Sequence, residues 1–164
     1  MEKIRSIMDK VLAAICALLL AFMTVLATYQ VITRYAFKAP STMSEDMLSY
    51  SFVWVSLLGA ALVFGQKDHM RLSLLSDKFK GVSGLVLSIF TELLIMGIAV
   101  IVFLVGGKDF VGVGALQTSP TLSITMDLVY VILPLSGILI IIYNVLNIIQ
   151  SIQKFNESGK EELQ

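Results

Sequence analysis

The chain alternates four long apolar stretches with short polar segments. Charged residues are absent from 11–33, 47–66 and 128–150, and the range 84–106 contains only Glu92. Each stretch matches the roughly 20 residues that a helix needs to cross a hydrocarbon core. Helices are expected in lipid because an open sheet edge would leave backbone groups without hydrogen bonds. The pattern predicts an all-α integral membrane protein with four transmembrane helices.

Composition supports contact with lipid rather than a soluble fold. Charged residues make up 15% of the 164 positions and hydrophobic residues 57%, whereas a soluble domain carries about 25% charged residues. The 12 cations and 12 anions balance, so no basic excess points to a nucleic acid partner. The first stretch is longer than the roughly 7–15 residues of a signal-peptide core. We therefore expect a retained first helix and a single membrane domain over residues 1–164.

Lysine and arginine predict the orientation of the four helices. Nine of the twelve lie in the N-terminal segment, the middle loop and the C-terminal segment, and the other three are Arg34, Lys38 and Lys108. Cytoplasmic loops carry an excess of these residues. We therefore expect both termini and the middle loop in the cytoplasm of a bacterial cell, and the first and third loops in the periplasm. The chain would be a multi-pass protein of the inner membrane.

The middle loop has an amphipathic pattern. Leu72, Leu75 and Phe79 share one helical face, which predicts a short helix at 71–80 lying in the membrane interface. His69 precedes it and is the one histidine in the chain. A structural role for this histidine is favoured over metal binding. The chain also has a single cysteine. One cysteine cannot form a cysteine metal cluster, and one histidine cannot supply both ligands of a haem held by two histidines. We therefore expect no cofactor.

Small and polar residues recur along one face of three predicted helices. The stripe of the first helix consists of Ala14, Ala17, Ala21, Thr24 and Thr28, and that of the fourth consists of Gly137, Asn144, Asn147 and Ser151. The stripe of the third helix consists of Ser88, Glu92, Ala99 and Gly106. Such residues let membrane helices approach closely, whereas apolar periodicity cannot identify a buried face in lipid. We favour packing within the four-helix bundle. Packing against a second membrane subunit stays open as the alternative.

Two side chains inside the predicted spans are candidates for specific interactions. Glu92 is an acid at membrane depth, which is costly and marks a functional candidate by default. It lies near the cytoplasmic third of its helix, so a hydrogen-bonded structural role is an equal alternative. Trp54 lies about two turns into the second helix, and we expect its indole N–H to find a partner in a neighbouring helix.

Local signals predict how the second and fourth helices begin. Thr42 and Glu45 have the spacing of a capping box, in which the glutamate reaches back to the threonine. Asp46, and Asp127 before the fourth helix, also suit the positive end of a helix dipole. Pro134 is expected to bend the fourth helix because it lacks an N–H group.

The order of these residues resembles a known family. The matching positions are Arg34-Tyr35-Ala36-Phe37, Pro40, Ser44-Glu45-Asp46, Trp54, Gly59-Ala60-Ala61, His69, Gln117, Ser119-Pro120, Leu122, Ile124, Asp127, Tyr130 and Pro134-Leu135-Ser136-Gly137. Together they are similar to the small permease (DctQ-type) subunit of tripartite ATP-independent periplasmic (TRAP) transporters. The resemblance runs from about Val31 to Gly137. Met43 stands where family members often have tryptophan, which affects expected local packing more than the assignment.

The resemblance implies a scaffold rather than an enzyme. Such a subunit supports a large membrane subunit that carries the substrate and sodium sites. A periplasmic solute-binding protein delivers an organic anion, commonly a carboxylate such as sialic acid or a dicarboxylate. The candidate subunit-interface or receptor-docking residues are Arg34, Glu45, Asp46, Trp54, Gly59, His69, Glu92, Gln117, Ser119, Pro120 and Asp127.

Two other functions remain as alternatives. The first is an independent, proton-coupled transporter that works as a dimer, like the four-helix multidrug exporters. It would use Glu92, although those exporters place their key glutamate in the first helix. A quinone- or haem-anchoring subunit is disfavoured by the single histidine. The sequence also lacks a phosphate-binding loop, a zinc-protease motif, a ladder of intramembrane charges and glycine-interrupted helices in matched halves. These absences favour an accessory subunit.

Overall fold

The computed structural model describes residues 2–65 and 82–161, and the regular elements in these ranges are helices. They are α1 (Glu2–Tyr35), α2 (Thr42–Gly65), α5 (Val82–Ile98), the π-helix η1 (Ala99–Gly106), α6 (Gly107–Gly114), α7 (Asp127–Tyr130) and α8 (Ile132–Glu161). Helices α5, η1 and α6 follow one another directly, and one residue separates α7 from α8. Four rods in the described part of the chain are long and apolar enough to cross a membrane, which confirms the four predicted helices.

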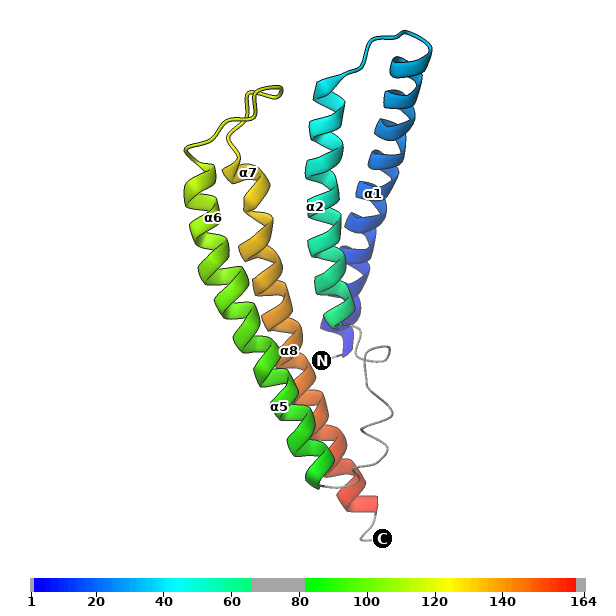
Figure 1. Ribbon diagram of the computed structural model, residues 1–164. Coiled ribbons are helices and arrows are strands. Elements are labelled where there is room, and N and C mark those ends of the chain that lie inside the picture. Colours follow the sequence, from blue (N-terminus) through cyan, green and yellow to red (C-terminus); the bar gives the residue numbers. More distant parts are fainter. Residues whose placement is uncertain (1, 66–81, 162–164) are drawn as a thin grey trace.

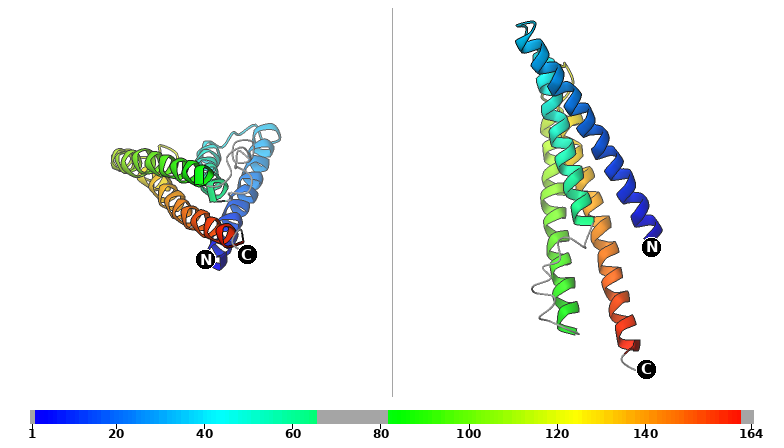
Figure 2. Two further views of the ribbon diagram at one scale, coloured as in Figure 1. Left: turned by 90° about the horizontal axis from the view of Figure 1, so that it is seen from below. Right: turned by 90° about the vertical axis from the view of Figure 1, so that its right-hand side faces the viewer.

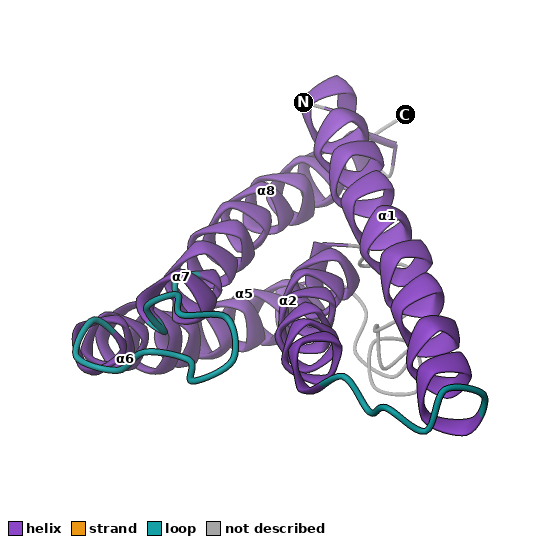
Figure 3. Ribbon diagram, turned by 90° about the horizontal axis from the view of Figure 1, so that it is seen from above, coloured by secondary structure: helices purple, strands orange, loops and turns teal. Residues whose placement is uncertain are grey.

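The rods form two antiparallel pairs. Helix α1 packs on α2, the α5–η1–α6 rod packs on α8, and α2 joins the pairs through contacts with α8 (Figure 1). Views along the bundle place α2 between α1 and the α5–α8 pair (Figure 2, Figure 3). We call the end with segments 36–41 and 115–126 the loop end, and the end with the chain termini the terminal end.

The buried core centres on α8. Ile140 and Tyr143 of α8 are almost fully buried and pack in a cluster with Leu12, Ala61 and Ala99 from three other elements. Between membrane helices such packing is favoured by van der Waals contact, since lipid is as apolar as the core. α8 is the most buried of the four rods, because it contacts α2 on one side and α5 with η1 on the other.

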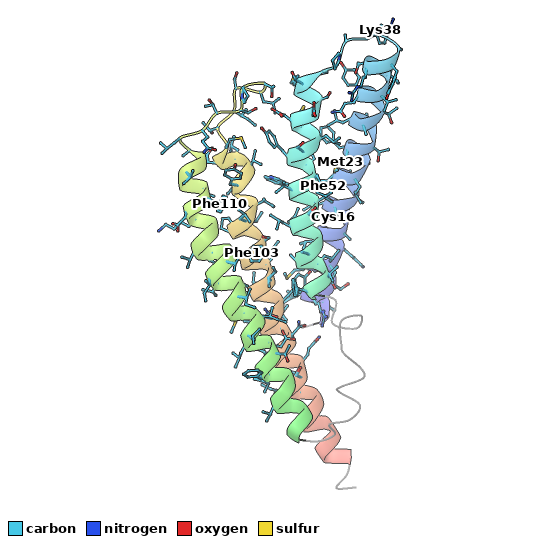
Figure 4. All side chains as sticks on the ribbon, viewed as in Figure 1. Cys16, Met23, Lys38, Phe52, Phe103 and Phe110 are labelled. Atoms are coloured by element: carbon cyan, nitrogen blue, oxygen red, sulfur yellow. The ribbon has the colours of Figure 1, made fainter. Side chains whose placement is uncertain are left out.

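The predicted stripe of the fourth helix is buried inside the bundle. Asn144 and Asn147 are each 1% exposed, and Gly137 and Ser151 are buried as well. An added Cβ at Gly137 would lie 2.6 Å from the Cβ of Phe103, which points from η1 toward α8 in Figure 4. The glycine therefore lets α8 and η1 approach closely, as expected for packing within the bundle.

The stripe of the first helix behaves differently, and the prediction that it packs within the bundle is wrong. All five of its residues are exposed. Leu12 is buried, and Cys16, Leu19 and Met23 are half-buried. These larger side chains face α2. Positions two apart in sequence differ by roughly 200° around an α-helix, so Ala14, Ala17 and Ala21, each two positions from one of these side chains, face away from α2. The larger side chains form the contact because each makes many van der Waals contacts with its neighbours.

The terminal end explains why α1 begins well before residue 11. The Arg5 guanidinium donates hydrogen bonds to the Gly65 carbonyl and to Oε1 of Gln150. The Tyr143 hydroxyl donates to Asp9 at 2.6 Å. These contacts tie the charged first turns of α1 to the end of α2 and to α8. A cation at the carboxyl end of α2 also suits the helix dipole.

The third and fourth rods also differ in detail from the sequence prediction. The third continues to Gly114 and includes eight π-helical residues, which no apolar periodicity could indicate. The fourth continues to Glu161. Its α-helical pattern is interrupted at Val131, close to Pro134, which has no N–H to donate to the carbonyl four residues before it. The predicted interfacial helix at 71–80 and His69 lie outside the described residues.

Candidate functional site

The start of α2 lies at the loop end and is capped one residue earlier than predicted. The Ser44 N–H donates to Oγ of Ser41 at 3.5 Å, and the Ser44 hydroxyl donates to the Ser41 carbonyl at 2.9 Å. The helix begins at Thr42, so the capping box with Thr42 as the cap is wrong. Glu45 is released from that role and is exposed in the first turn.

The carboxylate of Asp46 connects the two helical pairs. Its Oδ2 accepts hydrogen bonds from the hydroxyl of Ser119, at 3.1 Å, and from the hydroxyl of Thr121. Ser119 is only 2% exposed. Hydrogen bonds to an ionised acceptor are about twice as strong as those between neutral groups. Asp46, from the first pair, therefore holds a segment that belongs to the second pair.

That segment is residues 115–126, which we call the clamped loop. It is closed by an antiparallel bridge between Thr118 and Thr125. Within it, the Ser119 N–H donates to the Ile124 carbonyl at 2.8 Å, and the Met126 N–H donates to the Gln117 carbonyl at 2.9 Å. The segment is therefore internally hydrogen-bonded, unlike an open connection between helices.

The base of the clamped loop is closely packed. An added Cβ at Gly114 would lie 2.7 Å from the ring of Tyr130 and 2.8 Å from the backbone N of Asp127. The Tyr130 ring also meets Phe110 edge-on, with ring centroids 5.8 Å apart. Asp127 accepts the N–H of Leu128 at 2.9 Å, which agrees with its predicted position at the start of a helix. α6 and α7 are thus held together where the loop leaves them.

Trp54 makes the interhelical contact that the sequence predicts. Its indole N–H donates to the Val129 carbonyl at 3.2 Å. Val129 precedes the interruption of the fourth rod, where the regular helical hydrogen-bond pattern changes. The bond is a second link between the two helical pairs. It lies about two turns of α2 further from the loop end than the Asp46 contacts.

Replacing Trp54 with phenylalanine is expected to destabilise the chain by about 1–3 kcal/mol, since it removes this bond and leaves a buried carbonyl less satisfied. Reversible unfolding of the purified chain in mixed micelles measures the change. The matched control is Phe52→Leu on the same helix, where the ring is 60% exposed and a smaller loss is expected. Equal losses in the two variants would contradict the assignment.

The remaining candidates are spread over the bundle. Arg34 is exposed in the last turn of α1, near Lys38 at the tip of the first loop (Figure 4). Gln117 and Pro120 are exposed on the clamped loop. Gly59 lies in the middle of α2, and Glu92 is 8% exposed on α5. Gly59 and Glu92 thus lie away from the other candidates. The candidates at the loop end are Arg34, Glu45, Asp46, Gln117, Ser119, Pro120 and Asp127.

Some contacts at this end could not be found from the sequence. The sequence does not indicate the contacts of Ser41 and Thr121, although both side chains bind groups of α2. The hydroxyl residues at 119, 121 and 123 are the only signal, and they do not indicate which carboxylate they meet. Among the described residues, no three His, Cys, Asp or Glu side chains are placed to hold a metal ion.

Comparison with known proteins relates the chain to a transporter family. The family model "Tripartite ATP-independent periplasmic transporters, DctQ component" matches residues 23–154. A protein assigned as a TRAP transporter small permease in Haemophilus influenzae is 27% identical over 96 residues, which are 58% of this chain and 60% of that protein. The sialic acid TRAP transporter small permease protein SiaQ of Vibrio cholerae is 27% identical over 143 residues, 86% of this chain and 81% of that protein.

Proposed function

Because the chain belongs to the DctQ component family of tripartite ATP-independent periplasmic transporters, we propose that it is the small membrane subunit of a sodium-driven, binding-protein-dependent transporter. The observation that carries the proposal is the family match over residues 23–154, which reaches into all four rods. The family and the four apolar rods make the chain a multi-pass membrane protein. Its proposed place is the bacterial inner membrane, with the terminal end in the cytoplasm and the loop end in the periplasm.

Within that transporter the chain acts as a scaffold for a large membrane subunit, which carries the substrate and sodium sites. The exposed stripe of α1 supports this role, because small residues allow close approach of a membrane helix from outside the bundle. The hydroxyls of Thr24 and Thr28 donate to carbonyls of α1 at 2.8 Å. The stripe therefore exposes polar side chains whose hydrogen bonds are already made, which suits a face in contact with lipid or protein.

The transported solute is an organic anion, such as sialic acid or a dicarboxylate. The support is the name of the Vibrio cholerae relative, which is a sialic acid TRAP transporter subunit. Glu92 is the one charged residue within the four apolar stretches of this chain, so these stretches offer no cation to recognise an anionic solute. The choice of solute therefore belongs to the binding protein and the large subunit. The periplasmic binding protein docks at the loop end, near Arg34, Glu45 and the 117–120 segment.

Gly59 provides the test of the scaffold role. An added Cβ there meets nothing within 4 Å in the described chain, yet glycine costs a helix interior up to about 1 kcal/mol relative to alanine. Gly59→Leu is expected to leave the isolated chain as stable as before and to lower recovery of the large subunit in affinity purification. The measurement is the ratio of the two subunits after purification of a tagged chain.

The matched control for this experiment is Gly97→Leu on α5, where an added Cβ also has open space. Recovery of the large subunit is expected to be unchanged in that variant. Full recovery with Gly59→Leu would remove Gly59 from the interface. Failure of the unmodified chain to purify with any large membrane subunit would overturn the proposed function itself.

A further inference from the structure

We propose that Asp46 is a positioning residue for receptor docking, which holds the clamped loop against α2 so that its exposed residues form the surface met by the periplasmic binding protein. This inference rests on the proposed function, since it takes that receptor as the partner. It assigns to Asp46 a role distinct from that of its exposed neighbour Glu45.

The Asp46 carboxylate lies between two separate structural units. Asp46 belongs to the α1–α2 pair, and the clamped loop connects α6 to α7 in the other pair. In Figure 1 this loop, drawn in yellow, extends from α6 and α7 toward the loop end of α2. The bonds from Ser119 and Thr121 to Oδ2 of Asp46 bridge the two pairs at this level. Release of the carboxylate would free the loop from α2.

Hydrogen bonds around the carboxylate favour this arrangement. Asp46 is the fifth residue of α2, close enough to the loop end for its carboxylate to accept hydrogen bonds from the clamped loop. The Ser119 hydroxyl also contacts the Thr121 hydroxyl, at 3.2 Å, and accepts the N–H of Leu122, at 3.3 Å. One carboxylate thus orders two hydroxyls and, through them, the tip of the loop. Ser123, at that tip, has a φ of 52°, a strained backbone that persists only where the surroundings hold it.

The clamped loop exposes apolar and hydrogen-bonding side chains. Leu116 is 89% exposed, and Gln117, Thr118 and Pro120 are exposed beside it. No charged residue occurs from 110 to 126. The surface therefore offers apolar area and hydrogen-bonding groups in a fixed arrangement. A rigid surface of this kind lowers the entropy lost when a protein partner binds.

The first loop has a different character, because it also carries side chains that suit the lipid headgroups. Tyr35 and Phe37 are 76% and 71% exposed there, beside Arg34 and Lys38. Aromatic rings and long cations are typical of anchors at the lipid headgroups. The clamped loop contains no tyrosine, tryptophan, lysine or arginine. We therefore assign the soluble receptor, rather than lipid, to the clamped loop.

The test uses the complete transporter in proteoliposomes, with uptake measured against the concentration of solute-loaded receptor. Asp46→Ala is expected to raise the receptor concentration for half-maximal uptake about five- to tenfold, because the held loop becomes a minor population. The maximal rate stays within about twofold, since transport after docking does not involve the loop. Asp109→Ala, which removes an exposed acid from nearby α6, is the control with unchanged half-saturation.

Two further variants keep the test decisive. Thr121→Val removes one donor from the loop without changing α2 and is expected to give a smaller rise of about two- to threefold. Combined with Asp46→Ala, it should add nothing, because both changes break the same interaction. Additive effects, or a fall in maximal rate with unchanged half-saturation, would overturn the positioning role. Uptake by the wild-type transporter that does not depend on the receptor concentration would instead refute the proposed function.

Discussion

Gly137→Leu is expected to disrupt the packing of α8 on η1 and to destabilise the chain strongly. An added Cβ would stand 2.6 Å from the Cβ of Phe103 and 3.5 Å from the Phe103 backbone carbon. A Cβ is fixed to its helix, so relief requires the two helices to separate. Overpacking typically costs about 1–3 kcal/mol, and a whole leucine at a helix crossing should reach or exceed the upper value. A loss of this size is a large fraction of the roughly 5–15 kcal/mol that stabilises a folded protein.

Reversible unfolding in mixed micelles measures this loss, and Gly112→Leu is the matched control. Gly112 is exposed on α6, and an added Cβ there meets nothing within 4 Å. Its replacement is expected to leave stability unchanged or slightly higher, because leucine is the better helix former. Similar stabilities for the two variants would show that α8 and η1 do not depend on the glycine for their approach.

The second large effect concerns transport itself. Solute uptake is expected to be absent when the chain is reconstituted alone and to appear only with the large subunit and the loaded receptor. The physical reason lies in the spans. Carriers place their sites at broken helices with convergent polar groups, whereas Asn144 and Asn147 are buried in the packed centre of this bundle. Asn147 donates to the Phe64 carbonyl at 3.4 Å, so it serves helix packing.

Sequence patterns predicted the rods well because the length of an apolar stretch is a local property. A bond from the Trp54 indole N–H to a neighbouring helix was predictable because a buried indole N–H needs an acceptor, but the sequence did not indicate that the acceptor is Val129. The stripe of α8 was correctly placed inside the bundle. The identical argument failed for α1, because small residues mark a face that allows close approach but not the molecule that approaches it.

The contacts of the loop end were beyond sequence reasoning for a different reason. Asp46 and Ser119 are 73 positions apart, and their meeting depends on how α2 and the second pair are placed by packing near α8. The cap at Ser41 was missed because Ser41, Thr42 and Ser44 are all plausible caps by residue type. The π-helical residues of η1 share the apolar composition of the α-helix before them.

The role proposed for this chain is that of a scaffold subunit within a three-component transporter. The most direct measurement is uptake of a labelled organic anion into proteoliposomes under an inward sodium gradient, with each component omitted in turn. Uptake is expected with all three components, and no uptake when the chain, the large subunit or the receptor is left out. Uptake by this chain alone, abolished by Glu92→Gln, would contradict the scaffold role and show an independent carrier.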